Sequence, residues 1–196
     1  MRPHKEVRRN DILTAALDLA SQRGFRQAGM DEIGAAAGFT GPALYRYFRS
    51  KSDLLVSLHE RLIDMQLAVA MDVGILVDEN PTAALAWLVR SHAASVLDNL
   101  DLYRLYLHER SELPQEDALR LRRKLRPYFV TWQTAIQGHI GNLTPEEVTG
   151  FEGAVIGVLH SPVDFPSKLP KAELAVFLER AAWRVLGLNE PPNVSH

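Results

Sequence analysis

Cysteine is absent from this chain of 196 residues. Its absence excludes disulfide bonds, thiolate metal ligands and a cysteine nucleophile. Long apolar runs are missing as well: no segment approaches the roughly 18 residues that span a bilayer, and the first residues contain no signal-peptide core. We therefore expect a cytoplasmic protein without a membrane partner.

The sequence also lacks the common catalytic motifs. It contains no paired-histidine metal motif, no glycine-rich phosphate loop after a strand and no nucleophile elbow. His108-Glu109 has no second histidine four residues after the first. We expect no enzyme, no metal site and no cofactor. Because no segment alternates apolar and polar residues as a strand does, we expect an all-α fold.

Charge is distributed unevenly along the chain, although the net charge is only −2. Residues 1–52 contain nine Lys or Arg against five Asp or Glu, a net of +4. Residues 53–196 contain thirteen against nineteen, a net of −6. A basic N-terminal part on an acidic body is typical of a protein that meets phosphate at one end only.

The stretch from Met30 to Asp53 is the most informative part of the sequence. Residues 31–37 predict a short helix, which Gly38 ends because glycine adopts the left-handed cap conformation at little cost. Thr40 can cap a second helix, in which Leu44 and Phe48 lie one turn apart and can pack inward. Residues 50–53 (SKSD) are a capping-box variant that opens a third helix. This order predicts a helix-turn-helix with a recognition helix.

The motif resembles the tetracycline-repressor (TetR) family of bacterial transcription regulators over about residues 8–58. The residues that match the spacing of the family are Ile33, Ala37-Gly38, Thr40, Leu44-Tyr45, Phe48, Lys51 and Leu54-Leu55. The resemblance implies a three-helix DNA-binding domain over residues 1–52, with the motif at about 30–49. It also implies a C-terminal helical ligand-binding and dimerisation domain over residues 53–189. We expect residues 190–196 to form a disordered tail.

The sequence departs from the family pattern at two places. Ala28 and Gly29 stand where the family usually has Thr and Ser, so only backbone amides and the Glu32 carboxylate remain at the start of that helix. Gly41 replaces a longer polar residue that family members often carry. We therefore expect the DNA affinity to depend on Arg46, on Lys51, on the tyrosines and on the basic N-terminal arm.

The DNA contacts that we predict come from the start of the recognition helix and its surroundings. Small residues allow close approach to the groove, Pro42 or Ala43 could touch a thymine methyl, and Arg46 could contact guanine or phosphate. Lys51 opposes the helix dipole in a first turn, a cost that a bound phosphate would offset; the alternative is an indifferent surface lysine. The predicted DNA-binding residues are Thr40, Gly41, Pro42, Ala43, Tyr45, Arg46, Tyr47, Lys51, Arg8 and Arg9.

Alternatives remain for three of these residues. Tyr47 could be partly packed rather than bound to phosphate. Arg8 and Arg9 could belong to a solvated terminus rather than follow the phosphates.

Helical periodicity continues through the body. We predict helices at about residues 6–23, 53–72, 81–99, 101–112, 115–140 with a kink at Pro127, 144–160 and 171–186. In the family, the last two helices pair with their copies in a dimer, which implies an interface of Phe151, Val155, Val158, Leu159, Leu174, Phe177, Leu178, Ala181 and Val185. Most of these residues can also serve the intramolecular core.

The family encloses a small-molecule pocket in this body. The residues that could line it here are Met65, Val69, Trp87, His92, Tyr103, Tyr106, Tyr128, Phe129 and Trp132, although aromatic residues at helical spacing often form core instead. Residues 120–126 (RLRRKLR) could bind the phosphates of an acyl-CoA or form a solvated face paired with acidic residues.

We therefore predict a ligand-responsive regulator, most simply a homodimeric repressor released from palindromic duplex DNA by a small apolar or aromatic effector. The alternative is a helix-turn-helix protein that acts without an effector, through architectural or protein contacts.

Overall fold

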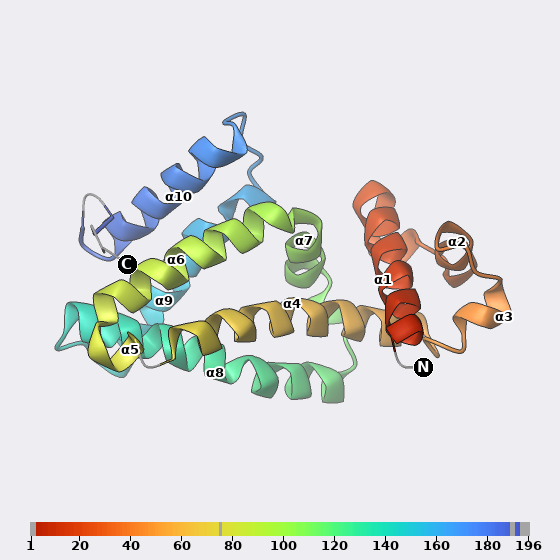
Figure 1. Cartoon of the computed structure of the whole chain (residues 1–196), viewed down its shortest axis with the longest axis horizontal. Helices are drawn as coiled ribbons and strands as arrows, with labels where there is room; N and C mark the ends of the chain where they lie inside the picture. Colours follow the sequence, from red (N-terminus) through yellow and green to blue (C-terminus); the bar gives the residue numbers. More distant parts are fainter. Residues whose placement is uncertain (1–2, 75, 189–190, 193–196) are drawn as a thin grey trace. The chain divides into compact units, whose positions relative to one another are not determined.

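The computed structural model describes residues 3–74, 76–188 and 191–192 (Figure 1). All regular secondary structure in these residues is helical, which confirms the predicted all-α fold. Within the same residues, no helix is both long and apolar enough to cross a membrane. Apart from Pro191 and Pro192, the predicted tail over residues 190–196 lies outside the described residues.

The chain forms two compact units. The first contains the residues up to Leu62 together with Asp101–Arg122, and the second contains Ile63–Leu100 together with the residues from Arg123 onward. Two long helices, α4 (Lys51–Val73) and α8 (Gln115–Ile140), contribute residues to both units. The boundary expected after residue 52 does not coincide with an edge of either unit.

The first unit is built around the N-terminal helices. Besides the first part of α4 and the start of α8, it contains α1 (Pro3–Arg23), η1 (Phe25–Gln27), α2 (Met30–Ala36), α3 (Gly41–Leu44), α7 (Leu100–His108, from Asp101 onward) and η2 (Arg110–Glu112). Ile12, Ile33, Leu44 and Phe48 are fully buried in it. Burial of side chains of this size stabilises the fold by about 1.5–3 kcal/mol each, so these four residues fix the arrangement of the short helices.

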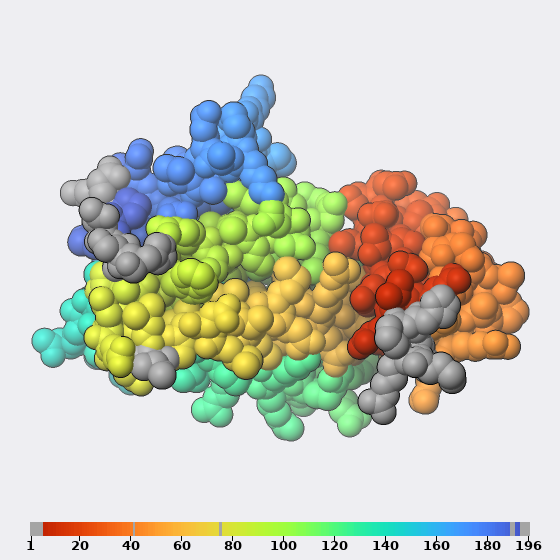
Figure 2. Space-filling view, viewed as in Figure 1, coloured from red at the N-terminus to blue at the C-terminus, as the bar shows by residue number. Residues whose placement is uncertain are grey.

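The second unit consists of α5 (Leu76–Glu79), α6 (Pro81–Asp98), α9 (Pro145–His160), η3 (Ser161–Val163), α10 (Lys171–Val185) and the remaining parts of α4 and α8. α10 packs against both α6 and α9, and the blue α10 lies beside the yellow-green α6 in Figure 1 and Figure 2. Trp132 and Trp183 are the largest fully buried side chains of this unit.

Local sequence signals explain most helix ends. Thr144 caps α9 in a capping box, in which its hydroxyl accepts from the Glu147 amide at 3.2 Å and the Glu147 carboxylate accepts from the Thr144 amide at 2.8 Å. α10 stops before Gly187, whose φ of +91° suits glycine. The short helices α5 and η3 lie between the predicted helices, where the sequence predicted no helix. The sequence did not indicate them because a single helical turn carries little periodic signal.

Candidate functional site

The turn between α2 and α3 has the geometry that the sequence predicted. The Gly29 amide donates to the Glu32 carboxylate at 2.9 Å, which satisfies one free donor at the start of α2. At the other end, Gly38 has φ +74°, its amide donates to the Ala35 carbonyl at 3.1 Å, and the Phe39 amide donates to the Gly34 carbonyl at 2.8 Å. These two bonds form a Schellman motif, which ends α2 sharply and sets the direction of α3.

The recognition helix is shorter than the sequence predicted. α3 covers only Gly41–Leu44, and the next three residues form turns. The Arg46 amide donates to the Ala43 carbonyl at 3.3 Å and the Tyr47 amide to the Leu44 carbonyl at 2.9 Å, the tighter i to i−3 pattern. Burial of Leu44 and Phe48 still holds both ends of this segment against the first unit.

Several of the predicted contact residues point away from the core of this segment. Tyr45 is 50% exposed, and Arg46, Thr40 and Pro42 are exposed as well. Tyr47 is half-buried, with its ring edge-on to Phe39 at a centroid distance of 5.5 Å. The segment after α3 therefore presents a phenol and a guanidinium to solvent, while Tyr47 serves packing at least in part. Ala43 is half-buried.

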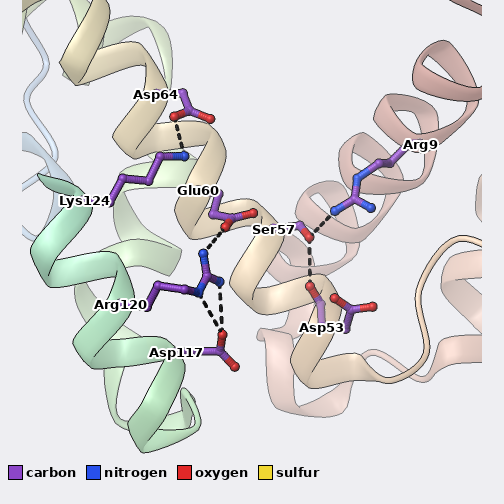
Figure 3. Close-up of polar contacts among 8 residues, drawn as sticks. All are labelled: Arg9, Asp53, Ser57, Glu60, Asp64, Asp117, Arg120 and Lys124. Carbon is purple, nitrogen blue, oxygen red and sulfur yellow. Dashed lines mark hydrogen bonds and ion pairs between the residues drawn. The ribbon is translucent and has the colours of Figure 1, made fainter. Parts of the chain in front are cut away.

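The adjacent residues Arg8 and Arg9 of α1 fold back onto the first unit. Arg9 donates to the Ser57 hydroxyl at 2.5 Å, and Ser57 in turn donates to the Asp53 carbonyl at 2.9 Å (Figure 3). The Arg9 guanidinium also lies 4.5 Å from the centroid of the Phe48 ring. Arg8 stacks in a similar way on Phe39, at 5.3 Å. Both cations therefore brace the helix-turn-helix, with Arg9 joining α1 to α4.

Lys51 at the start of α4 makes contacts inside the first unit. Its ammonium donates to the Arg26 carbonyl at 2.7 Å and lies 5.2 Å from the centroid of the Phe25 ring. Burial lowers the pKa of Lys51, and the carboxylates of Glu109 and Glu32 act in the opposite direction. An ammonium has three donors, so this bond to η1 leaves donors that a phosphate could accept.

The start of α4 is capped as the sequence predicted, with one difference. The Asp53 amide donates to the Ser50 hydroxyl at 3.1 Å, but the Asp53 carboxylate accepts from the Arg49 amide, at 3.0 Å, rather than from the amide of Ser50. The carboxylate of Asp53 thus binds the amide four residues before it, whereas a standard capping box binds the amide three residues before.

Ion pairs that the sequence did not predict join η1 to η2 and to the residue before η2. Arg26 pairs with Glu112 at 2.5 Å and with Glu109 at 3.7 Å. Glu112 lies 86 residues from Arg26 in the sequence, so no local pattern could have indicated the pair. It ties the connection that precedes α2 to residues 101–122, which the sequence had assigned to the body.

Comparison with known proteins assigns the helix-turn-helix. Residues 12–58 match the family model described as bacterial regulatory proteins, tetR family. The match contains α2, the Schellman turn, α3 and the capped start of α4. The helix-turn-helix of this chain is of the TetR-family type.

A curated relative matches only part of this chain. The HTH-type transcriptional activator FasR of Mycolicibacterium smegmatis is 40% identical over 60 residues, which are 31% of this chain and 27% of FasR. The chain thus aligns with only about a quarter of that relative's length.

Solved TetR structures match over nearly the whole chain. A TetR-family regulator from Bordetella parapertussis superposes with a TM-score of 0.80 at 17% identity, over 96% of this chain and 97% of its own. AibR, crystallised with isovaleryl coenzyme A and operator DNA, gives 0.73 at 22% identity, over 94% and 100%. These likenesses establish the fold of both units.

The residues predicted to line a TetR ligand pocket are divided between the two units. Tyr103 and Tyr106 belong to the first unit and the other seven to the second. In the second unit, His92, Tyr128 and Trp132 are buried and their rings lie 6.0–6.3 Å apart, and Phe129 lies against Tyr128 at 5.9 Å. Trp87 is 39% exposed, while Met65 and Val69 are half-buried.

A polar chain runs through this aromatic cluster. His92 Nδ1 lies 2.6 Å from the Tyr128 hydroxyl, and His92 Nε2 lies 2.8 Å from His160 Nε2. Burial lowers the pKa of His160 to about 4 and lowers the pKa of His92 as well, with the neighbouring His160 adding to the effect on His92. Both imidazoles are therefore neutral at pH 7, and one hydrogen joins the two facing nitrogens.

The residues predicted for a dimer interface differ in exposure. Val155, Leu159 and Leu178 are buried within the chain, so they support α9 and α10 from inside. Phe177 is 55% exposed, and its neighbour Val176, which the prediction did not include, is equally exposed. The remaining five (Phe151, Val158, Leu174, Ala181 and Val185) are half-buried.

The basic run over residues 120–126 is partly paired with acidic residues. Arg120 pairs with Glu60 at 2.5 Å and with Asp117 at 3.0 Å, and Lys124 pairs with Asp64 at 2.5 Å (Figure 3). These contacts are of the kind expected of a solvated face. Exposed pairs of this kind typically contribute up to about 1 kcal/mol each.

Proposed function

We propose that this chain is a transcription regulator that binds duplex DNA with the segment from Thr40 to Lys51. The observation that carries the proposal is the Schellman turn within the TetR match, followed by exposed Tyr45 and Arg46. A major groove admits such a segment, and a guanidinium can reach either base edges or phosphates from it. The +4 net charge of residues 1–52 favours phosphate binding by the same end of the chain.

Titration of a palindromic fragment from the chain's own upstream DNA tests this proposal, with fluorescence anisotropy at several salt concentrations. Arg46→Ala should weaken binding and reduce the salt slope by about one unit if the guanidinium neutralises one phosphate. Arg122→Ala is the matched control, because it removes an exposed arginine outside the helix-turn-helix. Equal losses in the two variants, or no binding by the unmodified chain, would contradict the proposal.

The DNA-bound form that we propose is a homodimer, since two recognition segments about one DNA turn apart read a palindrome. Supporting observations come from α9 and α10. α10 exposes Val176 and Phe177, and a Cβ built on Gly150, Gly153 or Gly157 of α9 would meet nothing within 4 Å. A partner helix can approach such a surface closely. Sedimentation of the unmodified chain should give a dimer. Phe177→Asp should raise the dissociation constant of the dimer and increase the fraction of monomer.

A small-molecule effector is the second part of the proposal. Coenzyme A thioesters are the class to test first, because AibR was crystallised with isovaleryl coenzyme A and operator DNA. Arg120 and Lys124 are engaged with carboxylates, which leaves the exposed Arg122, Arg123 and Arg126 as cations for phosphates. In anisotropy titrations with acyl-CoAs of increasing chain length, at least one acyl-CoA should lower the affinity of the chain for DNA.

An effector-free regulator is the competing proposal, and the aromatic cluster favours it. His92, Tyr128 and Trp132 contact one another and are buried, as core residues are. DNA binding that no acyl-CoA or other small apolar ligand changes would support this second function.

A further inference from the structure

A groove of about 560 Å³ lies in the second unit, between α5, the start of α6, the second half of α8 and the start of α9. Val77, Pro81 and Val148 give it an apolar wall, and Gln133, Gln137 and Asp78 provide polar groups. This volume is within the range of small-molecule sites. None of the nine residues that the sequence predicted for the effector pocket lines it.

Glu152 is a buried carboxylate next to this groove. It lies on α9 one turn after Val148 and Thr149, which line the groove, and it is only 9% exposed. One carboxylate oxygen accepts from the side-chain amide of Gln133 at 2.5 Å, and Gln133 itself lines the groove. Gln133 thus connects the groove with the carboxylate.

The partner of Glu152 is a neutral amide, and no Lys, Arg or His of the described residues forms an ion pair with it. Burial of a carboxylate without a cation is costly, and it raises the pKa of Glu152, while the bond from Gln133 offsets part of the effect. A cation placed beside this carboxylate would remove the cost. The chain thus keeps a carboxylate that is costly for the fold directly behind Gln133, a residue that lines the groove.

The charges at the groove favour a cationic ligand over an anionic one. Asp78 lines it and Glu152 adjoins it, whereas no basic residue is among the lining residues. A carboxylate or phosphate would be repelled by both groups, and an ammonium would be attracted. The apolar wall can accommodate a hydrocarbon portion of the same molecule.

We propose that this groove binds a small amine, with its ammonium at Glu152 and Gln133 and its apolar portion along Val77, Pro81 and Val148. The Gln133 carbonyl and the Glu152 carboxylate are both acceptors, so they can share the three donors of a primary ammonium. The site is separate from the DNA-binding segment, and it does not require DNA binding.

Isothermal titration of the full chain at neutral pH with n-octylammonium tests the proposal, and octanoate serves as the anion of matched length. Wild type should bind the amine more tightly than the anion. Glu152→Gln should weaken amine binding by roughly tenfold or more, because the charge-assisted bond is lost. Glu146→Gln removes an exposed carboxylate from the first turn of the same helix and should leave binding unchanged.

A second variant blocks the groove without changing Glu152. Thr149→Trp places a large side chain on the exposed lining position and should abolish amine binding while the circular-dichroism spectrum stays that of wild type. Undetectable binding of n-octylammonium to wild type at millimolar concentration would overturn the proposal. The proposal is also overturned if octanoate binds as tightly as the amine, or if Glu152→Gln and Thr149→Trp both retain wild-type affinity.

Discussion

Acidification should destabilise this protein through the facing pair His92 and His160. His92 is 2% exposed, and its ring nitrogens contact the Tyr128 hydroxyl and His160 Nε2 at 2.6 and 2.8 Å. One hydrogen fits between the two facing imidazole nitrogens, so the two rings cannot both be protonated, and burial favours the neutral form of each. Protonation of His160 places a charge in a half-buried position against His92, a cost that the unfolded chain does not have.

The sign and the size follow from the pKa of His160. Burial lowers it from 6.5 to about 4, so between these two values the unfolded chain binds more protons than the folded one. Stability is therefore fully present above about pH 6.5 and is lost as the pH falls from there towards 4. The difference corresponds to about 3 kcal/mol in total, of which about 2 kcal/mol is lost by pH 5.

Other groups modify the slope. Burial lowers the pKa values of His92, His59 and His139, and these residues add to the loss of stability in acid. Glu152 acts in the opposite sense: burial raises its pKa, so the folded state binds that proton more readily and gains stability as the pH falls.

Urea denaturation followed by tryptophan fluorescence, at fixed protein concentration and at several pH values, measures this dependence. His160→Gln keeps hydrogen-bonding capacity beside His92 but cannot titrate there. Its stability should fall by about 2 kcal/mol less than that of wild type between pH 7.5 and 5. His108→Gln, at an exposed position on α7, is the control and should follow wild type. A flat wild-type profile, or equal slopes in wild type and His160→Gln, would refute the reasoning.

Four substitutions test the packing and the helix ends, again by urea denaturation. Gly38→Ala should cost about 1 kcal/mol because φ is +74°, whereas Gly150→Ala, in an open helical position, should be neutral or stabilising; a reversed order would contradict this account. Gly138→Ala should cost about 1–3 kcal/mol, since its Cβ would lie 2.5 Å from Pro81 Cγ, and unchanged stability would mean that α6 and α8 separate easily. Thr144→Ala should cost about 1 kcal/mol through the lost cap of α9, and an unaffected midpoint would show that packing alone fixes this helix start.

The sequence determined the local features of this fold. The Gly38 turn, the capping boxes at Thr144 and Ser50 and the extents of the long helices were all predicted from short segments. Such features depend on residues within about four positions of one another, so the sequence contains the whole signal. The family match rests on the same local pattern.

The tertiary structure decided which charged residues are engaged. Arg9 and Lys51 were predicted as DNA contacts, and both have partners within the first unit: Ser57 is 48 residues from Arg9, and Arg26 is 25 residues from Lys51. The sequence contained the cations but could not supply these distances. Their DNA contacts stay predictions, and Arg46 and Arg49 are exposed cations between α3 and α4.

In the second unit, the sequence likewise indicated which residues are buried but not which side chains contact one another. Periodicity indicated that His92, Tyr128 and Trp132 are apolar-face residues, and their burial agrees with a core role. The facing contact of His92 with His160 and the amide partner of Glu152 depend on which helices pack together, because each joins side chains from different helices. The local sequence encodes the helix positions, whereas the partners of the buried polar groups and the groove next to Glu152 depend on how the helices pack.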